Sequence, residues 1–136
     1  MCARRWNSFL NDKLAVALGD VLAENKTLTS VNLESNLLRA PGIEAIAAGL
    51  AQNRTLKVLK MANLHAPGSS SVIKVHAGVE MRIASAVEWH PALLKLTADL
   101  RHVPARDVVR KTLERNAEKE REMQRRGSAG SLAEET

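Results

Sequence analysis

The stretch at residues 25–36 constrains the fold more than any other part of the sequence. It places apolar side chains at Leu28, Val31 and Leu33 and ends at Asn36, which gives the spacing L-x-x-L-x-L-x-x-N. Such spacing fits a short strand whose apolar side chains enter a core, followed by a turn where an asparagine amide can hydrogen-bond to open backbone groups. One such stretch is weak evidence, so the interpretation depends on recurrence.

The pattern recurs twice. Residues 53–61 overlay residues 25–33 at a displacement of 28, and residues 90–98 form a degraded third copy 37 residues further on. The surplus of nine residues fits an enlarged loop at 63–77. A strand and a helix in each unit of about 28 residues are typical of leucine-rich repeats. The sequence therefore predicts an α/β fold, a short leucine-rich-repeat solenoid of about three strand-helix units with a parallel sheet, closed by a C-terminal helix.

Helical spacing of apolar residues appears around each predicted strand. The expected buried positions are Leu10, Leu14, Leu18, Val21 and Leu22 in the first helix, Ile43, Ile46, Ala47 and Leu50 in the second, Val79, Ile83 and Val87 in the third, and Val109, Leu113 and Ala117 in the last. We expect an irregular segment at 1–9, the repeat domain at 10–103, a capping, basic helix at 104–126 and a flexible tail at 127–136. The first half of the last helix should dock on the final repeat, and its second half should project.

Composition narrows the class of protein. The chain has 136 residues, one cysteine and three aromatic side chains, so aliphatic residues must fill its core. A single cysteine allows no internal disulfide and fits a reducing compartment. No apolar run approaches the ~20 residues of a membrane helix. We therefore expect a cytoplasmic protein that does not contact membranes.

Residue types that carry chemistry are sparse. The sequence has no glycine-rich phosphate loop, paired metal motif or nucleophile elbow, so we expect no enzyme activity, no cofactor and no metal. The four histidines, at 65, 76, 90 and 102, are too widely spaced for two to share adjacent helical turns. His90 occupies the position of Asn25 and Asn53, which favours a turn-capping role. A pocket that gathers two or more histidines or acids would favour an enzyme instead.

Two surfaces are candidates for partner binding. Glu34, Arg39 and Lys60 lie on or just after the predicted strands, where solenoids commonly bind partners, although strand alternation alone would place polar side chains toward solvent. Residues 101–126 carry nine basic and five acidic side chains, a net charge of +4 out of +5 for the chain. This helix is a docked cap with a solvated tail, a partner-binding helix or a nucleic-acid contact; scarce aromatics and interspersed acids make nucleic acid the least favoured.

Three short segments carry a resemblance to a known family: Ser30-Val31-Asn32-Leu33-Glu34-Ser35-Asn36, Val79-Glu80-Met81-Arg82-Ile83-Ala84-Ser85 and Leu93-Leu94-Lys95-Leu96. In this order, they resemble segments of the C-terminal domain of tropomodulin and leiomodin. The resemblance implies a cytoskeletal, actin-binding domain that helps to cap or organise the pointed end of actin filaments. By position it implies actin contacts at Glu34, Arg39, Arg106, Arg110 and Arg115.

The resemblance does not extend to the N-terminal half of that family, which holds its tropomyosin-binding helices. Tropomyosin is therefore not an expected partner. The alternative function is that of a generic leucine-rich-repeat scaffold, a fragment of a larger regulatory protein with an unknown protein partner. Actin binding and an effect on pointed-end elongation would separate the two interpretations.

Overall fold

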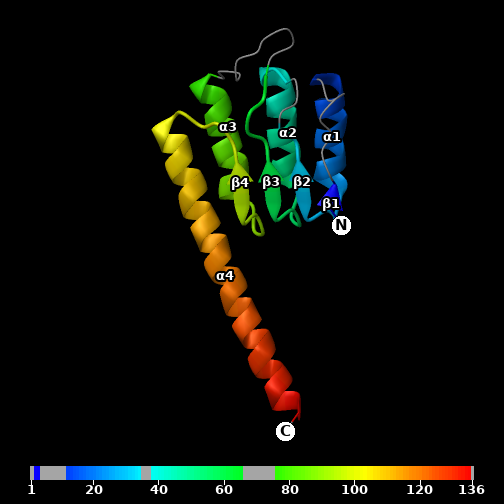
Figure 1. Ribbon diagram of the computed structural model, residues 1–136, viewed down its shortest axis with the longest axis vertical. Coiled ribbons are helices and arrows are strands. Elements are labelled where there is room, and N and C mark those ends of the chain that lie inside the picture. Colours follow the sequence, from blue (N-terminus) through cyan, green and yellow to red (C-terminus); the bar gives the residue numbers. More distant parts are fainter. Residues whose placement is uncertain (1, 4–11, 35–37, 66–75, 136) are drawn as a thin grey trace.

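Four strands alternate with four helices in the computed structural model, which describes residues 2–3, 12–34, 38–65 and 76–135 and, at the C-terminal end, side chains as far as residue 127. The elements in order are β1 (Cys2–Ala3), α1 (Asp12–Glu24), β2 (Ser30–Asn32), α2 (Ala40–Gln52), β3 (Val58–Lys60), α3 (Ala77–Glu88), β4 (Lys95–Thr97) and α4 (Val103–Glu135). Figure 1 shows α1, α2 and α3 side by side, while α4 extends well past the rest of the molecule.

The strands form one parallel sheet in the order β1-β2-β3-β4. Val31 pairs with Leu59, 28 residues later, and Leu59 pairs with Leu96, 37 residues later. These are the two displacements that the sequence predicted, so the enlarged connection at 63–77 adds residues without shifting the register. The predicted α/β leucine-rich-repeat solenoid is confirmed.

Strand β1 was not predicted. Cys2 pairs with Ser30 and Ala3 with Val31, again 28 residues apart, so the sheet begins one unit earlier than expected. The prediction of an irregular segment at 1–9 is wrong for these two residues, because a two-residue strand is too short to show an alternating pattern. Residues 1 and 4–11, including the expected helical position Leu10, lie outside the described part of the chain.

The core lies between the sheet and the helices and is aliphatic. Leu22, Val31, Ile46, Leu50 and Leu59 are almost fully buried in it. The expected stripe of α1 is partly wrong: Leu14 is 39% and Val21 51% exposed, while Ala15 is fully buried. The side of α1 that carries Gly19 packs against α2. This orientation leaves Leu14 and Val21 on the opposite side of the helix, where they are exposed.

Two glycines bring α1 and α2 into close contact. A Cβ atom at Gly49 would overlap the carbonyl oxygen and Cα of Gly19, and one at Gly19 would overlap the carbonyl of Ala45. Glycine is required here for the close approach of two backbones rather than for its dihedral freedom. The first two repeats are thereby packed at backbone contact.

Helix boundaries follow local sequence. Pro41 lies in the first turn of α2, as predicted, where its missing N–H costs no hydrogen bond. In the segment 127–136, where we expected a flexible tail, α4 continues to Glu135. A helix that is already formed extends at little cost, and the two glycines of this segment, Gly127 and Gly130, do not stop it. In the described ranges no helix is both long and apolar enough to cross a membrane.

Candidate partner-binding surfaces

A row of asparagines fixes the turns that lead into the strands. The Oδ1 atom of Asn25 accepts hydrogen bonds from the backbone N–H groups of Thr27 (2.8 Å) and Leu28 (2.7 Å). Asn53 does the same one unit later, to Thr55 (2.9 Å) and Leu56 (2.7 Å). The Nδ2 group of Asn53 also donates to the carbonyls of Leu22 and Asn25.

His90 takes the asparagine position in the third copy, and its predicted turn-capping role is confirmed. Its Nδ1 atom accepts from the N–H groups of Ala92 (3.1 Å) and Leu93 (3.0 Å), so the ring proton is assigned to Nε2, 3.3 Å from Asn53 Oδ1. Burial, and secondarily the charge of Arg54, lowers the pKa of His90 to about 4. The side chain is therefore neutral at pH 7 and completes the polar row.

Asn116, on α4, ends this row. Its Nδ2 group donates to the carbonyls of His90 (2.9 Å) and Leu93 (2.8 Å), and the residue is buried. The neighbouring Arg115 donates through Nη2 to the carbonyls of Glu88 (3.1 Å) and His90 (3.3 Å). Sequence reasoning missed Asn116; the available signal was a polar residue three positions after Leu113 on the docked face.

A buried carboxylate holds the other end of the docked segment. Glu80, on α3, accepts hydrogen bonds from the backbone N–H groups of Arg101 and His102, the latter at 3.0 Å. Its side chain is buried, and these donors compensate the loss of water. Together Glu80 and Asn116 fix α4 against the last repeat at two points. The sequence did not predict this role, because a glutamate in the first turn of an amphipathic helix such as α3 is ordinarily expected to face solvent.

The predicted strand-side residues fall on two neighbouring units, those of β2 and β3. The Oε1 atom of Glu34 accepts from the hydroxyl of Thr97 at 3.0 Å, which connects the end of β2 to β4. Lys60 lies on β3 in register with Asn32 and next to Thr97 of β4, and it is half-buried. Arg39 is exposed at the N-cap of α2. Asn36 lies outside the described residues.

The predicted arginines of α4 divide into two kinds. Arg106 and Arg110 are exposed, and Arg110 pairs with Glu114 at 3.3 Å one helical turn away. Arg115 contacts the end of α3, as described above, so part of its role is to dock the helix. The structure thus places the strand-side set and the helix set on different elements.

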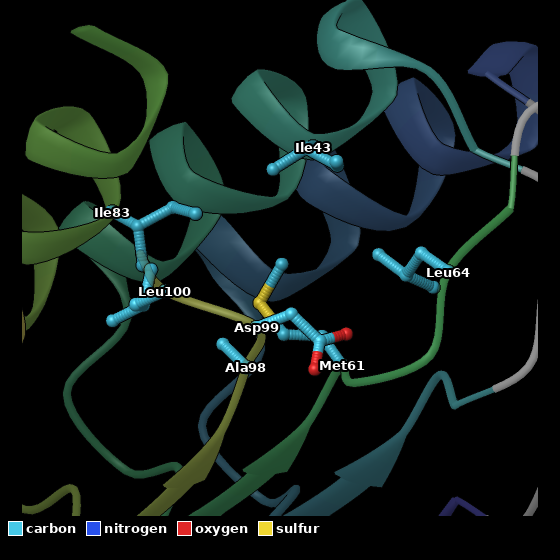
Figure 2. A pocket seen from close by; sticks show the side chains of 7 residues that line it. All are labelled: Ile43, Met61, Leu64, Ile83, Ala98, Asp99 and Leu100. Carbon is cyan, nitrogen blue, oxygen red and sulfur yellow. The ribbon is translucent and has the colours of Figure 1, made fainter. Parts of the chain in front are cut away.

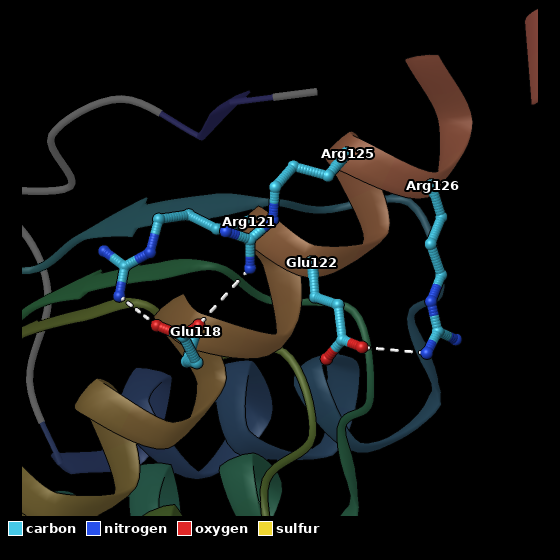
Figure 3. A network of polar contacts seen from close by, with 5 residues as sticks. All are labelled: Glu118, Arg121, Glu122, Arg125 and Arg126. Carbon is cyan, nitrogen blue, oxygen red and sulfur yellow. Dashed lines mark hydrogen bonds and ion pairs between the residues drawn. The ribbon is translucent and has the colours of Figure 1, made fainter. Parts of the chain in front are cut away.

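Beyond Ala117 the helix carries a ladder of ion pairs. Figure 3 shows Glu118 with Arg121 (2.7 Å) and Arg125 (3.5 Å), and Glu122 with Arg126 (2.8 Å). The hydrogen bond from Arg121, followed by its charge, lowers the pKa of Glu118. All of these side chains face solvent, so each pair stabilises the helix only slightly. Their common effect is to keep this half of α4 helical and charged.

The small cavity in Figure 2 has no room for a substrate. It measures about 30 Å³ and lies among Ile43, Met61, Ile83 and Leu100, with Asp99 as its one charged lining residue. The Oδ2 atom of Asp99 accepts a hydrogen bond from the backbone N–H of Asn63 at 2.7 Å. Space of this size suits a water molecule at most. The described residues contain no group of three or more side chains suited to hold a metal ion.

Comparison with known proteins decides the family. Residues 5–119 match the family model of the TMOD/LMOD leucine-rich domain. The chain belongs to this family. The tropomodulin and leiomodin relatives include rat leiomodin-1, 36% identical over 117 residues, and human tropomodulin-4, 29% identical over 116 residues. Each match covers 85% of the chain but only 18% and 31% of the respective relative.

Solved structures of the tropomodulin and leiomodin family share the fold. The structure titled leiomodin-1 actin-binding site 2 matches with a TM-score of 0.73 and 34% identity, and the Caenorhabditis elegans tropomodulin C-terminal domain with 0.74 and 25%. The matches cover 89% and 87% of this chain and 66% of each solved chain. The resemblance inferred from three short segments is thereby confirmed over most of the sequence.

Proposed function

We propose that this chain is a non-enzymatic, actin-binding domain of the cytoskeleton. The observation that carries the proposal is the similarity to a solved structure whose title describes it as actin-binding site 2 of leiomodin-1, which covers 89% of the chain at 34% identity. The fold supplies a rigid solenoid with an exposed, charged helix, and both features suit recognition of a protein surface. Contribution to pointed-end capping is the finer form of this proposal.

Within the proposal, actin contacts come from the two predicted surfaces. Glu34, Arg39 and Lys60 supply the strand-side contacts, and Arg106 and Arg110 supply exposed positive charge on the docked half of α4. Such charges speed association with an acidic partner and fix its orientation. Arg115 is proposed as a contact as well, although its bonds to backbone carbonyls mean that replacing it also loosens the helix.

Co-sedimentation with filamentous actin tests the proposal. The unaltered chain should sediment with actin at tens of micromolar protein, and the double variant Arg106→Glu, Arg110→Glu should bind about tenfold more weakly, a loss near 1.4 kcal/mol. The control Lys13→Glu, Lys26→Glu changes two exposed lysines in and just after α1 by the same charge and should bind normally. Circular dichroism confirms that each variant is folded.

Absence of sedimentation by the unaltered chain, together with no effect on pointed-end elongation, would defeat the actin proposal and leave the generic repeat scaffold. For the finer proposal, elongation is followed from filaments blocked at their barbed ends. Slower pointed-end growth at saturating protein supports capping, and unchanged growth despite actin binding restricts the function to binding filament sides or monomers.

A further inference from the structure

A groove lies beside the docked part of α4, away from the residues that the sequence singled out. It measures about 410 Å³ and lies between the helix and the turns that precede β3 and β4. Its lining includes Arg54, Lys57, Pro91, Ala92, Lys119 and Met123. A volume of this size accommodates a few side chains of a partner. No residue of the two proposed actin-contact sets lines this groove.

The charge of the groove is positive. Arg54, Lys57 and Lys119 contribute three cations, and Glu120 contributes one carboxylate, which pairs with Lys57 at 3.0 Å. That pair leaves Arg54 and Lys119 as the excess of +2. The Nη1 group of Arg54 donates to the Trp89 carbonyl at 3.2 Å, so its position is fixed while its other N–H groups can face a ligand. The charges complement carboxylates.

An apolar component accompanies these charges. Met123 lines the groove and is 71% exposed, beside Pro91 and Ala92. Trp89, bonded through its carbonyl to Arg54, is 74% exposed. Methionine adapts to differently shaped apolar groups, and tryptophan and arginine are enriched among residues that dominate binding energy. The exposed Met123 side chain within the groove suits a protein partner better than a purely ionic ligand.

The walls of the groove are held in place without a ligand. Asn116 binds the backbone carbonyls of His90 and Leu93, and Lys57 reaches Glu120 across the groove. These bonds connect α4 to both turns, so binding need not order them. A preformed surface loses less conformational entropy when a partner binds.

We propose that this groove binds an acidic segment of a partner protein, with carboxylates at Arg54 and Lys119 and an apolar side chain against Met123. The inference goes beyond the proposed function, because it assigns a second recognition surface and does not require that the partner be actin. It also accounts for the exposure of Met123 on a stretch of helix that is otherwise polar or charged.

Fluorescence anisotropy with labelled synthetic peptides tests the inference on the full chain. The probe alternates glutamate and leucine over twelve residues; one comparison peptide has every leucine replaced by serine, and another has every glutamate replaced by lysine. The first peptide should bind, the serine peptide about fivefold more weakly and the lysine peptide not measurably. Equal binding of a single-stranded oligonucleotide or of anionic lipid vesicles would overturn the inference.

Variants place the binding in the groove. Arg54→Glu with Lys119→Glu should weaken the glutamate-leucine peptide at least tenfold, and Met123→Ser about threefold. The control Lys26→Glu, Lys111→Glu makes the same charge change at exposed positions outside the groove and should bind within twofold. Normal peptide binding by the groove variant, or none by the unaltered chain, overturns the inference. The actin assays test the proposed function separately. The chain can bind or fail to bind actin whether or not it binds the peptide, so failure of one proposal can be told from failure of the other.

Discussion

Two interfaces in this solenoid are held together by different means: the one between α1 and α2, and the one that docks α4 on the last repeat. At the first, Gly19 and Gly49 bring two backbones into contact, and no side chain intervenes. At the second, Glu80 and Asn116 hold α4 through hydrogen bonds to backbone groups of other segments. Close backbone packing depends on the absence of a side chain, whereas polar docking depends on the presence of particular ones.

The difference shows how a repeat array ends. Each internal turn is capped by a side chain from its own unit, Asn25, Asn53 or His90, and each of the latter two also bonds to the unit before it. The carbonyls of the last turn would remain open, and Asn116 satisfies them from outside the repeat pattern. A helix that supplies this amide can close the array without repeating its sequence.

The largest effect is expected at the interface between α1 and α2. Gly49→Val places a branched side chain against the backbone of Gly19, which cannot move without separating the helices. Overpacking of this kind typically costs 1–3 kcal/mol, and we expect about 3 kcal/mol or more here because the obstacle is backbone. Urea denaturation measures the loss. The control Gly127→Ala, where a Cβ meets nothing within 4 Å, should be neutral or slightly stabilising; equal stability of both variants would contradict the packing.

The next effect concerns pH. The pKa of His90 is about 4 in the folded protein against an ordinary 6.5. Since the folded state favours the neutral ring, this stability is fully present above pH 6.5 and is lost as pH falls toward 4, by on the order of 3 kcal/mol. His90→Asn keeps the cap and should abolish this dependence. Unfolding free energies of both proteins between pH 7 and 4 give the difference, and parallel curves would contradict the assigned protonation.

Loss of the closing amide should cost somewhat less. Asn116→Ala leaves the carbonyl of Leu93 without this donor and that of His90 with Arg115 alone. Buried groups deprived of a partner cost 1–3 kcal/mol, so we expect about 2 kcal/mol and faster proteolysis within α4. Lys111→Ala, on the exposed side of the same helix, is the control. A change below about 0.5 kcal/mol would mean that water replaces the amide.

The smallest effect is expected on the solvent face. Arg110→Ala breaks the pair with Glu114, in which both side chains are more than half exposed. Pairs of this kind contribute below about 0.5 kcal/mol, and salt screens them. Thermal unfolding should therefore change little, even though the same substitution is expected to weaken actin binding. A large stability loss would show that Arg110 has a docking role.

Spacing predicted what depends on periodic burial. The strands around Val31, Leu59 and Leu96 and the capping role of His90 follow from positions that repeat at 28 and 37 residues. The family was predicted from the particular residues of three short segments, and comparison with known proteins confirms it.

Non-repeating contacts could not be predicted in this way. Glu80 and Asn116 bind groups that are distant in sequence, and the exposure of Leu14 depends on which side of α1 packs against α2. The groove beside Met123 could not be predicted either, because it forms only where α4 passes the turns that precede β3 and β4. The actin contacts at Glu34, Arg39, Lys60, Arg106, Arg110 and Arg115 remain predictions, because a surface charge carries no periodic signal for a partner.

Amide hydrogen exchange along α4 tests most directly the account that the helix is docked up to Glu120 and solvated beyond it. We expect amides at 105–120 to exchange nearly as slowly as those of α2, and amides from Arg121 onward to exchange orders of magnitude faster, since only local fraying is needed to expose them. Asn116→Ala should shift the boundary toward Val109. Uniformly fast exchange throughout α4 would contradict the docking, and with it the closed array and the groove.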